Sequence, residues 1–111
     1  MNSQKNKGDR AEREAAELLS ELLPWPVRRR LGAGRNDDEG DLEGVPDCAL
    51  QVADWQDKSG ACLIKPREVE LQRRNAKAKY AASIIRWRGG HYRAVLTLEQ
   101  FAKLLPAAID D

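Results

Sequence analysis

Acidic and amide side chains in one segment of the chain have the types and the spacing of a cation site. Residues 36–57 contain eight acidic side chains and neither lysine nor arginine. Asp41 lies at the end of one short expected strand, and Gln51 lies near the end of the next, at 48–53. A carboxylate and an amide oxygen on adjacent strands, with the Val52 carbonyl between them, are hard ligands that suit Mg²⁺ or Mn²⁺. A cation held there could activate water and stabilise the charge that develops during phosphodiester hydrolysis.

Position 53 is where such a site would use a basic group, and it holds Ala53. Side chains alternate along a strand, so residues 51 and 53 share one face and point into the same pocket. A lysine two residues after Gln51 would orient and polarise the attacking water, with its pKa set by burial and by the carboxylates. Alanine leaves this position without an amine.

Glu12 is the candidate acid that the first helix contributes. Spacings of four and three residues place it on the apolar stripe that Ala16, Leu19 and Leu23 form. A carboxylate at the N-terminal end of a core-facing stripe points towards the sheet on which the helix packs. Glu12 also has a simpler interpretation, as an acid near the helix start that complements the helix dipole.

Basic side chains flank the acidic segment on both sides, although the net charge of the chain is only +1. Residues 26–35 carry four arginines and no acid, and residues 63–93 carry nine basic and two acidic side chains. Lysine and arginine on one helix often do no more than solvate it. Basic segments around an acidic pocket, however, suit a protein that grips a polyanion at a cation site. The predicted phosphate contacts are Arg28, Arg29, Arg30, Arg35, Arg73 and Arg74.

Length and composition are typical of a single globular domain. The chain has 111 residues, of which 33% are charged and 41% hydrophobic. We expect one domain over residues 1–111, with residues 1–7 as a flexible tail. No window approaches the roughly 18 apolar residues of a membrane span, and the polar N-terminus lacks a signal-peptide core. Cys48, Cys62 and His91 do not have the spacing of a zinc site, and a reduced, cytoplasmic compartment is expected.

Three helices and five strands are expected around the candidate site, in the order α-β-β-β-α-β-β-α. The expected helices are 8–23, 66–81 and 98–105, and the expected strands are 26–31, 41–44, 48–53, 83–88 and 92–96. Thr97 is the expected N-cap of the last helix, with Gln100 in the capping-box position. Residues 54–61 are expected to form a polar loop. The predicted fold class is α/β, of the α+β type.

Several motifs make the chain resemble the PD-(D/E)XK nuclease superfamily. The stretch 7–14 is similar to the opening helix of that family, with its Gly-x-x-x-Glu. Gly40-Asp41-Leu42 and Leu50-Gln51-Val52-Ala53 stand where the family carries Asp and then Glu-x-Lys. The resemblance extends over nearly the whole chain and is to archaeal-type Holliday junction resolvases and related small phage nucleases. The stretches 70–76 and 96–101 look like small actinobacterial phage proteins of this type.

This resemblance implies a restriction-endonuclease-like αβββαβ core, with a mixed central sheet flanked by helices. It implies a structure-selective DNA endonuclease that depends on Mg²⁺ or Mn²⁺ and acts on branched DNA, such as a four-way junction. Because a four-way junction is two-fold symmetric, a homodimer is expected. The setting would be the cytoplasm of a bacterium or of a phage-infected host cell, with no membrane partner.

Residue by residue, the resemblance makes Glu12 and Asp41 metal-site acids and gives Gln51 the Asp/Glu position, where an amide oxygen ligates without charge. Asp47 follows a proline, as does the aspartate after which the family is named, and it is the alternative to Asp41. Only three residues separate Asp47 from Gln51, however, which favours Asp41 as the metal ligand.

Three interpretations account for Ala53 at the position of the catalytic lysine. The alanine is an engineered, inactivating substitution, or Lys58 or Lys65 reaches the pocket from the adjoining loop, or the chain is a natural pseudonuclease that binds DNA without cutting it. Lys58 also has a simpler interpretation, as a solvated loop residue. A protein-interaction module, in which the segregated charges serve a protein partner, is the remaining alternative.

Overall fold

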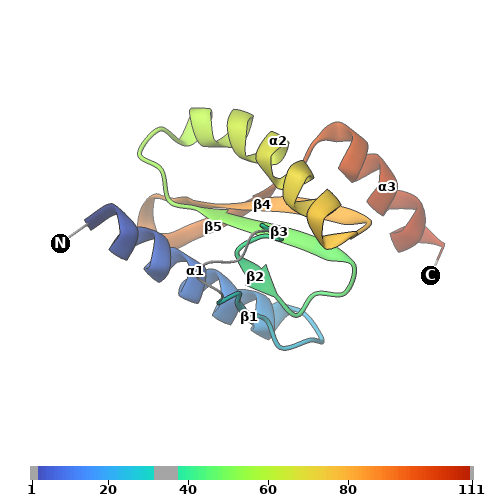
Figure 1. Ribbon diagram of the computed structural model, residues 1–111, viewed down its shortest axis with the longest axis horizontal. Coiled ribbons are helices and arrows are strands. Elements are labelled where there is room, and N and C mark those ends of the chain that lie inside the picture. The colour runs from blue at the N-terminus through green and yellow to red at the C-terminus, as the bar shows by residue number, and fades with distance from the viewer. Residues whose placement is uncertain (1–2, 32–37, 111) are drawn as a thin grey trace.

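A single sheet lies between helices on its two faces. The computed structural model describes residues 3–31 and 38–110. α1 covers one face of the sheet and α2 covers the other, and the two termini lie at opposite ends of the molecule (Figure 1). The expected α+β class is confirmed. In chain order the elements are α1 (Ser3–Leu22), β1 (Arg28–Arg29), β2 (Leu42–Glu43), β3 (Cys48–Ala53), α2 (Lys58–Ala76), β4 (Tyr80–Trp87), the short 3₁₀ helix η1 (Arg88–Gly90), β5 (His91–Val95) and α3 (Leu98–Ile109).

The five strands form one mixed sheet in the order β1-β2-β3-β4-β5. β1, β2 and β3 are antiparallel neighbours, and Leu42 pairs with both Arg29 and Leu50. α2 crosses over the sheet, so that β4 runs parallel to β3, with Gln51 opposite Ser83. β5 returns antiparallel to β4. The result is a mixed sheet flanked by helices, as expected.

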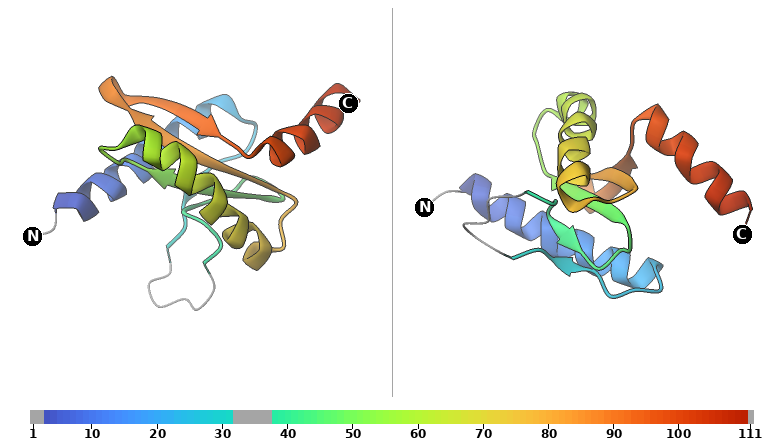
Figure 2. Two further views of the ribbon diagram at one scale, coloured as in Figure 1. Left: turned by 90° about the horizontal axis from the view of Figure 1, so that it is seen from above. Right: turned by 45° about the vertical axis from the view of Figure 1, so that its right-hand side comes forward.

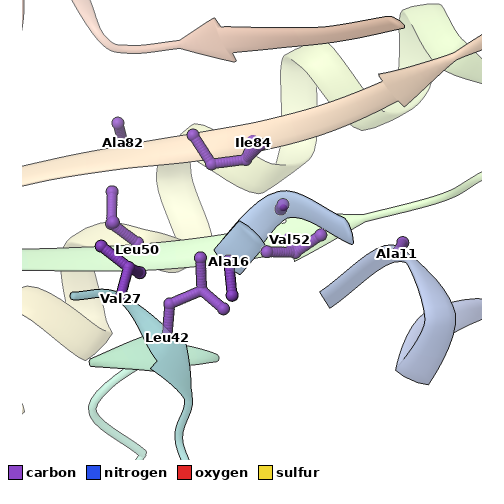
Figure 3. Close-up of a cluster of buried hydrophobic side chains, with 9 residues drawn as sticks. Ala11, Ala16, Val27, Leu42, Leu50, Val52, Ala82 and Ile84 are labelled. Carbon is purple, nitrogen blue, oxygen red and sulfur yellow. The ribbon is translucent and has the colours of Figure 1, made fainter. Parts of the chain in front are cut away.

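The larger part of the core lies between α1 and the sheet. Small side chains on α1 let the helix approach β3 closely, and branched side chains from the strands fill the contact. Figure 3 shows these side chains gathered between the helix and the strands. They are Ala11, Ala15, Ala16, Val27, Leu42, Leu50, Val52, Ala82 and Ile84.

The opposite face of β3 packs on α2, and it is the face that carries Gln51 and Ala53. Ala49 packs with Val69 of α2, and Ala53 packs with Ala61 at the start of the same helix. Because strand side chains alternate, Gln51 lies on this face between the two alanines. The expectation that positions 51 and 53 share one face is therefore confirmed.

The first two predicted elements differ from the structure in length. α1 begins at Ser3, so part of the segment expected to be a flexible tail is helical. β1 consists of Arg28 and Arg29 alone, rather than 26–31. The Arg30 N–H still donates to the Asp41 carbonyl at 2.8 Å, so the pairing with the chain before β2 extends slightly beyond the strand. Residues 32–37, which include the predicted phosphate contact Arg35, lie outside the described residues.

α2 begins and ends earlier than predicted. The expected loop at 54–61 is wrong in its second half, because the Asp57 side chain caps a helix by accepting a hydrogen bond from the Gly60 N–H at 2.9 Å. Pro66 consequently lies inside the helix and not at its start. The helix ends at Ala76 because Lys77 takes a left-handed conformation, with φ of 54°, and its N–H bonds back to the last turn.

α3 is capped as predicted but holds its glutamine differently. The Thr97 side chain accepts a hydrogen bond from the Gln100 N–H at 3.1 Å. The Gln100 side chain does not complete a capping box. Its Oε1 accepts from the Ala81 N–H at 3.1 Å, and its Nε2 donates to Glu70 at 3.4 Å. The Ala81 N–H is available because β5 pairs with β4 only from Ser83 onwards.

Figure 2 shows that α3 extends away from the sheet towards the C-terminus. Across residues 3–31 and 38–110, none of the helices combines the length and the hydrophobicity needed to cross a lipid bilayer.

Candidate metal and DNA site

Asp41 is fixed at the edge of β3, at the point where β2 begins. Its backbone N–H donates to the Leu50 carbonyl at 2.7 Å, which continues the pairing of β2 with β3. Its side-chain Oδ2 accepts a hydrogen bond from the Val52 N–H at 2.8 Å. The carboxylate is therefore held against the backbone of the strand that carries Gln51.

The surroundings of Asp41 disfavour its ionised form. Burial is the main reason why its pKa rises from 3.8 to about 6, and the negative charges of Glu12 and Asp38 raise the pKa further. The Val52 N–H and the positive charge of Lys65 act in the opposite direction. Acids from α1 and from the segment before β2 thus converge on Asp41. A cation among them would relieve their mutual repulsion.

Glu12 extends from α1 and is paired with an arginine. Its Oε1 accepts a hydrogen bond from Nε of Arg29 at 3.1 Å, and Nη2 of Arg29 lies 3.0 Å from Oδ1 of Asp9. Arg29 therefore joins two acids of α1 to β1. Its guanidinium is engaged in this network, whereas the sequence predicted a phosphate contact.

Gln51 is buried with half of its amide unsatisfied. Only 7% of the residue is exposed, and its Nε2 donates to Oε1 of Glu68 on α2 at 3.3 Å. Within the described residues its Oε1 has no hydrogen-bond partner. Oγ of Ser83, on the residue that pairs with Gln51 in β4, is likewise buried without a partner there. Two oxygens with free lone pairs therefore lie on neighbouring strands, on the face towards α2.

Lys65 of α2 brings a positive charge to this group of residues. Its Nζ lies 2.9 Å from the same Glu68 oxygen that Gln51 contacts, and it also lies 4.7 Å from the centre of the Trp55 ring. The hydrogen bond from Lys65 is the main reason why the pKa of Glu68 is lowered. The charge of Lys65 also acts on Asp41. One lysine therefore interacts both with Asp41 and with the glutamate that Gln51 contacts.

Lys58 is held elsewhere. It is the first residue of α2, and its Nζ lies 3.2 Å from Oδ1 of Asp54, a carboxylate at the end of β3 that is almost completely buried. Arg10 and Arg86 also approach Asp54, at 3.9 and 4.0 Å. Lys58 therefore belongs to an ion-pair cluster around Asp54, and the structure brings Lys65 rather than Lys58 to the neighbourhood of Asp41 and Gln51.

Ala53 is enclosed by packing. It is 5% exposed and lies in a small apolar cluster with Ala61 of α2 and Ile85 of β4. The volume next to position 53, on the face shared with Gln51, is therefore occupied by the first turns of α2.

Asp47, the alternative metal ligand, has a structural role. It adopts a left-handed backbone conformation, with φ of 58°, in the turn before β3. Its Oδ1 accepts a hydrogen bond from the Lys79 N–H at 2.8 Å, and its carbonyl accepts from the Tyr80 N–H at 3.0 Å. These bonds fix the start of β4 and hold Asp47 at the turn before β3.

The remaining arginines predicted to contact phosphate differ in whether their side chains are exposed or already bonded within the fold. Arg28 is exposed and only loosely paired with Glu43, at 3.8 Å, and Arg74 is exposed on α2. Arg73 instead bonds to Glu70 at 2.9 Å and to the Ala78 carbonyl at 3.1 Å, which stabilises the end of α2. Nε of Arg30 is buried without a hydrogen-bond partner among the described residues.

Oxygen donors of these types suit a hard cation, but together they carry little charge. Among residues 3–31 and 38–110, no group of three or more histidine, cysteine, aspartate or glutamate side chains is placed to hold a metal ion. Asp41, Glu12 and the free oxygen of Gln51 would provide two carboxylates and one neutral ligand, and the Val52 carbonyl could add a second neutral oxygen. Such a set suits a cation that keeps several waters.

Glu68 and Asp38 belong to this group although the sequence did not indicate them. The spacing of Lys65 and Glu68, three residues apart, would have indicated a pair if the helix had been predicted to begin before Pro66. Asp38 is held on α2 by Gln72, whose Nε2 donates to its Oδ2 at 2.8 Å, and no local pattern predicts that contact.

No family model, curated protein or solved structure matches the chain.

Proposed function

We propose that this protein is a metal-dependent, structure-selective DNA endonuclease of the Holliday junction resolvase type, which hydrolyses phosphodiester bonds in branched DNA. The observation that carries the proposal is the environment of Asp41. A half-buried carboxylate with a raised pKa stands among other acids and bonds to the strand that carries the unsatisfied, buried oxygen of Gln51. The choice of branched DNA rests on the motif resemblance, and the α+β fold with a mixed sheet is compatible with it.

Asp41, Glu12 and Gln51 would hold Mg²⁺ or Mn²⁺, with the Val52 carbonyl as a further ligand. When bound, the cation would lower the pKa of an attacking water and stabilise the charge that develops on the phosphate. The Val52 N–H orients the Asp41 carboxylate, and Arg29 holds Glu12 in place. These contacts would keep the ligands in position before substrate arrives.

Lys65 would supply the positive charge that Ala53 does not. It approaches from α2 instead of from β3, and its ion pair with Glu68 holds its amine next to Gln51. From that place it could help to orient the attacking water and offset negative charge at the phosphate.

The test is cleavage of a labelled four-way junction with Mg²⁺ or Mn²⁺. We expect the chain to cut the junction and Lys65→Ala to lose most of this activity. Lys58→Ala should keep the activity. Circular dichroism checks that Lys58→Ala, which lacks the ion pair with Asp54, is still folded. Asp41→Asn should abolish cutting. If neither the original chain nor Ala53→Lys cuts the junction with any divalent cation, the enzyme proposal is wrong.

A second candidate function is a DNA-binding protein that does not cut. The burial of Ala53 against Ala61 favours it, because the space beside the expected lysine position is filled. Tight junction binding in the presence of Mg²⁺, with no cleavage by the original chain, would support this alternative. Absence of binding to both duplex and branched DNA at low salt would contradict both candidates.

A further inference from the structure

A cavity of about 440 Å³ lies where the start of α1 meets the connection from β3 to α2. Figure 1 shows these two segments at the same end of the molecule. The cavity shares no residue with the set that would hold the cation, and four of its six lining residues have polar or charged side chains. The lining residues are Lys7, Gly8, Asp54, Trp55, Gln56 and Asp57.

Asp54 brings to the cavity wall a carboxylate with spare hydrogen-bonding capacity. Only 4% of its side chain is exposed, and its Oδ1 accepts a hydrogen bond from Lys58 at 3.2 Å. Its Oδ2 accepts no hydrogen bond within the described residues, although the guanidinium groups of Arg10 and Arg86 approach it at 3.9 and 4.0 Å. Buried polar atoms usually have a hydrogen-bond partner. A ligand N–H that reached Asp54 would supply the missing bond.

Trp55 and Gln56 add an aromatic surface and an amide to the same wall. Trp55 is partly exposed, with Nζ of Lys65 at 4.7 Å from its ring centre. Gln56 is exposed, and its amide has no hydrogen-bond partner among the described residues. An indole ring offers a flat apolar face, and an amide can both donate and accept. A ring for stacking and polar groups for the edge of a planar ligand are what proteins use to bind an unpaired nucleobase.

Basic side chains of α1 stand at the same place. Lys7 lines the cavity, is exposed and has no acidic partner in the part of the chain that the structure describes. The side chain of Arg10 is 52% exposed, and its contact with Asp54, at 3.9 Å, is loose. A nucleotide whose base entered the cavity would therefore find two cations for its phosphate.

Gly8 keeps this cavity wide. It lies inside α1, where glycine is less stable than alanine. Its backbone is not left-handed, and a Cβ atom there would meet no other atom within 4 Å. Neither the backbone nor the packing therefore requires glycine at position 8. A long side chain at this position would enter the cavity.

We propose that this cavity binds the base of one unpaired nucleotide in DNA, stacked on Trp55 and hydrogen-bonded to Asp54 and Gln56. The proposal rests on the proposed function, and it names the feature by which branched DNA is distinguished from a duplex. Bases in a duplex are paired and stacked, so extruding one is costly, whereas a base that is already unpaired leaves the stack at little cost. The volume of the cavity is in the range of small-ligand sites.

Other ligands fit the cavity less well. A metal ion is disfavoured because the basic side chains of Lys58, Arg10 and Arg86 surround the carboxylate of Asp54. A wholly apolar ligand is disfavoured because the wall is mostly polar. A free nucleotide shares the chemistry of the proposed ligand but lacks the neighbouring phosphates, so we expect it to bind more weakly than a nucleotide within DNA.

Three labelled duplexes of equal length test the proposal. One is fully paired, one carries a single unpaired deoxyadenosine, and in the third the same unpaired nucleotide lacks its base. Fluorescence anisotropy should show that the original chain binds the second duplex about tenfold more tightly than the other two, as expected for one base stacked on an aromatic ring. Trp55→Leu and Gly8→Phe should lose this preference. The matched controls should keep it: Gly8→Ala leaves the cavity open, and Trp25→Leu changes an exposed tryptophan beyond the other end of α1.

Circular dichroism checks that each variant is folded, and if one of Trp55→Leu and Gly8→Phe does not fold, the other decides. Equal binding to the paired duplex, equal binding to the duplex that lacks the base, or an unchanged preference in the folded variants would overturn the inference and leave DNA binding itself intact. If no DNA binds at low salt, the proposed function and this inference are both wrong. Deoxyadenosine monophosphate that binds more tightly than the second duplex, measured by calorimetry, would assign the cavity to a free nucleotide and overturn the assignment to DNA.

Discussion

The ionisation of Asp41 should be visible in the stability of the folded chain. Its pKa is raised from 3.8 to about 6, so between these values the folded state holds a proton that the unfolded state has lost. The protonated carboxyl therefore contributes stability that is fully present below pH 4 and is lost as the pH rises through 6. Two pKa units correspond to about 3 kcal/mol as an upper limit.

We predict that Asp41→Asn is more stable than the original chain above pH 6 in the absence of divalent cations, by about 1–3 kcal/mol. The amide can still accept from the Val52 N–H but carries no charge. The measurement is denaturant unfolding of both chains from pH 4 to pH 8. Acids that do not interact with Asp41 contribute equally in both chains, so the difference reports Asp41 together with its interactions with neighbouring acids. A difference that does not change with pH would refute the assignment.

Divalent cations should reverse this order of stability between the original chain and Asp41→Asn. Mg²⁺ or Mn²⁺ binds the ionised carboxylate, so millimolar cation should raise the melting temperature of the original chain at pH 8 and have little effect at pH 5. Asp41→Asn should show no such rise at either pH. Removal of the cation with a chelator should restore the original melting temperature. Equal stabilisation of both chains would mean that the cation binds elsewhere.

At the residue scale, the sequence indicated the residues of the candidate site better than it indicated which side chains those residues contact. Asp41 and Gln51 could be singled out because a short strand and its neighbour have clear patterns. Arg29 could not be recognised as the partner of Glu12, because their contact depends on how closely α1 approaches β1. Lys65 was one of two candidates, and only the packing of α2 separates it from Lys58, which Asp54 holds.

At the scale of elements, two glycines give opposite predictions for the same substitution. Gly44 has φ of 118° in the turn between β2 and β3, and a Cβ atom there would overlap the Pro26 carbonyl oxygen. Gly44→Ala should therefore lower the free energy of unfolding by about 1–3 kcal/mol, since both the conformation and the contact are unfavourable for alanine. It should also reduce any activity, because this turn aligns β1 with the strand that follows Asp41.

Gly8→Ala is the matched control. Gly8 lies inside α1, and a Cβ atom there would meet no other atom within 4 Å. Alanine should stabilise the helix by about 0.5–1 kcal/mol. Urea unfolding measures both variants. If both substitutions changed stability in the same direction, the conformation of the β2–β3 turn would differ from the one described.

The elements that sequence predicted well are those with strong local signals. β3 has its predicted limits because an apolar run is bounded by turns, and α3 begins at its Thr97 cap. The sequence places the start of α2 too late, because proline is typical of a first helical turn, whereas the residue that caps this helix is Asp57. Local propensity gives little weight to a polar segment such as 54–61, and the packing of Ala61 on Ala53 makes that segment helical.

At the scale of the whole molecule, the segregation of charge remains visible but is reduced by pairing. Much of the positive charge near the candidate site is used inside the fold, since Arg29 and Arg73 bond to acids. Arg28 and Arg74 stay exposed and are the better candidates for contact with a DNA backbone. Composition alone could not separate these two groups, because pairing depends on tertiary contacts.

This distinction predicts how DNA binding should depend on salt. Each arginine that contacts a phosphate displaces a counterion, so Arg28→Ala and Arg74→Ala should each weaken binding to any DNA sequence and lower the slope of log affinity against log salt by about 0.9. Arg73→Ala should mainly lower stability, because it removes the bonds to Glu70 and to the Ala78 carbonyl. Lys103→Ala, which changes an exposed lysine on α3, is the control and should leave the slope unchanged. Fluorescence anisotropy with a labelled four-way junction at several salt concentrations gives the slopes. Equal slopes for the original chain, Arg28→Ala and Arg74→Ala would place the phosphate contacts on other residues.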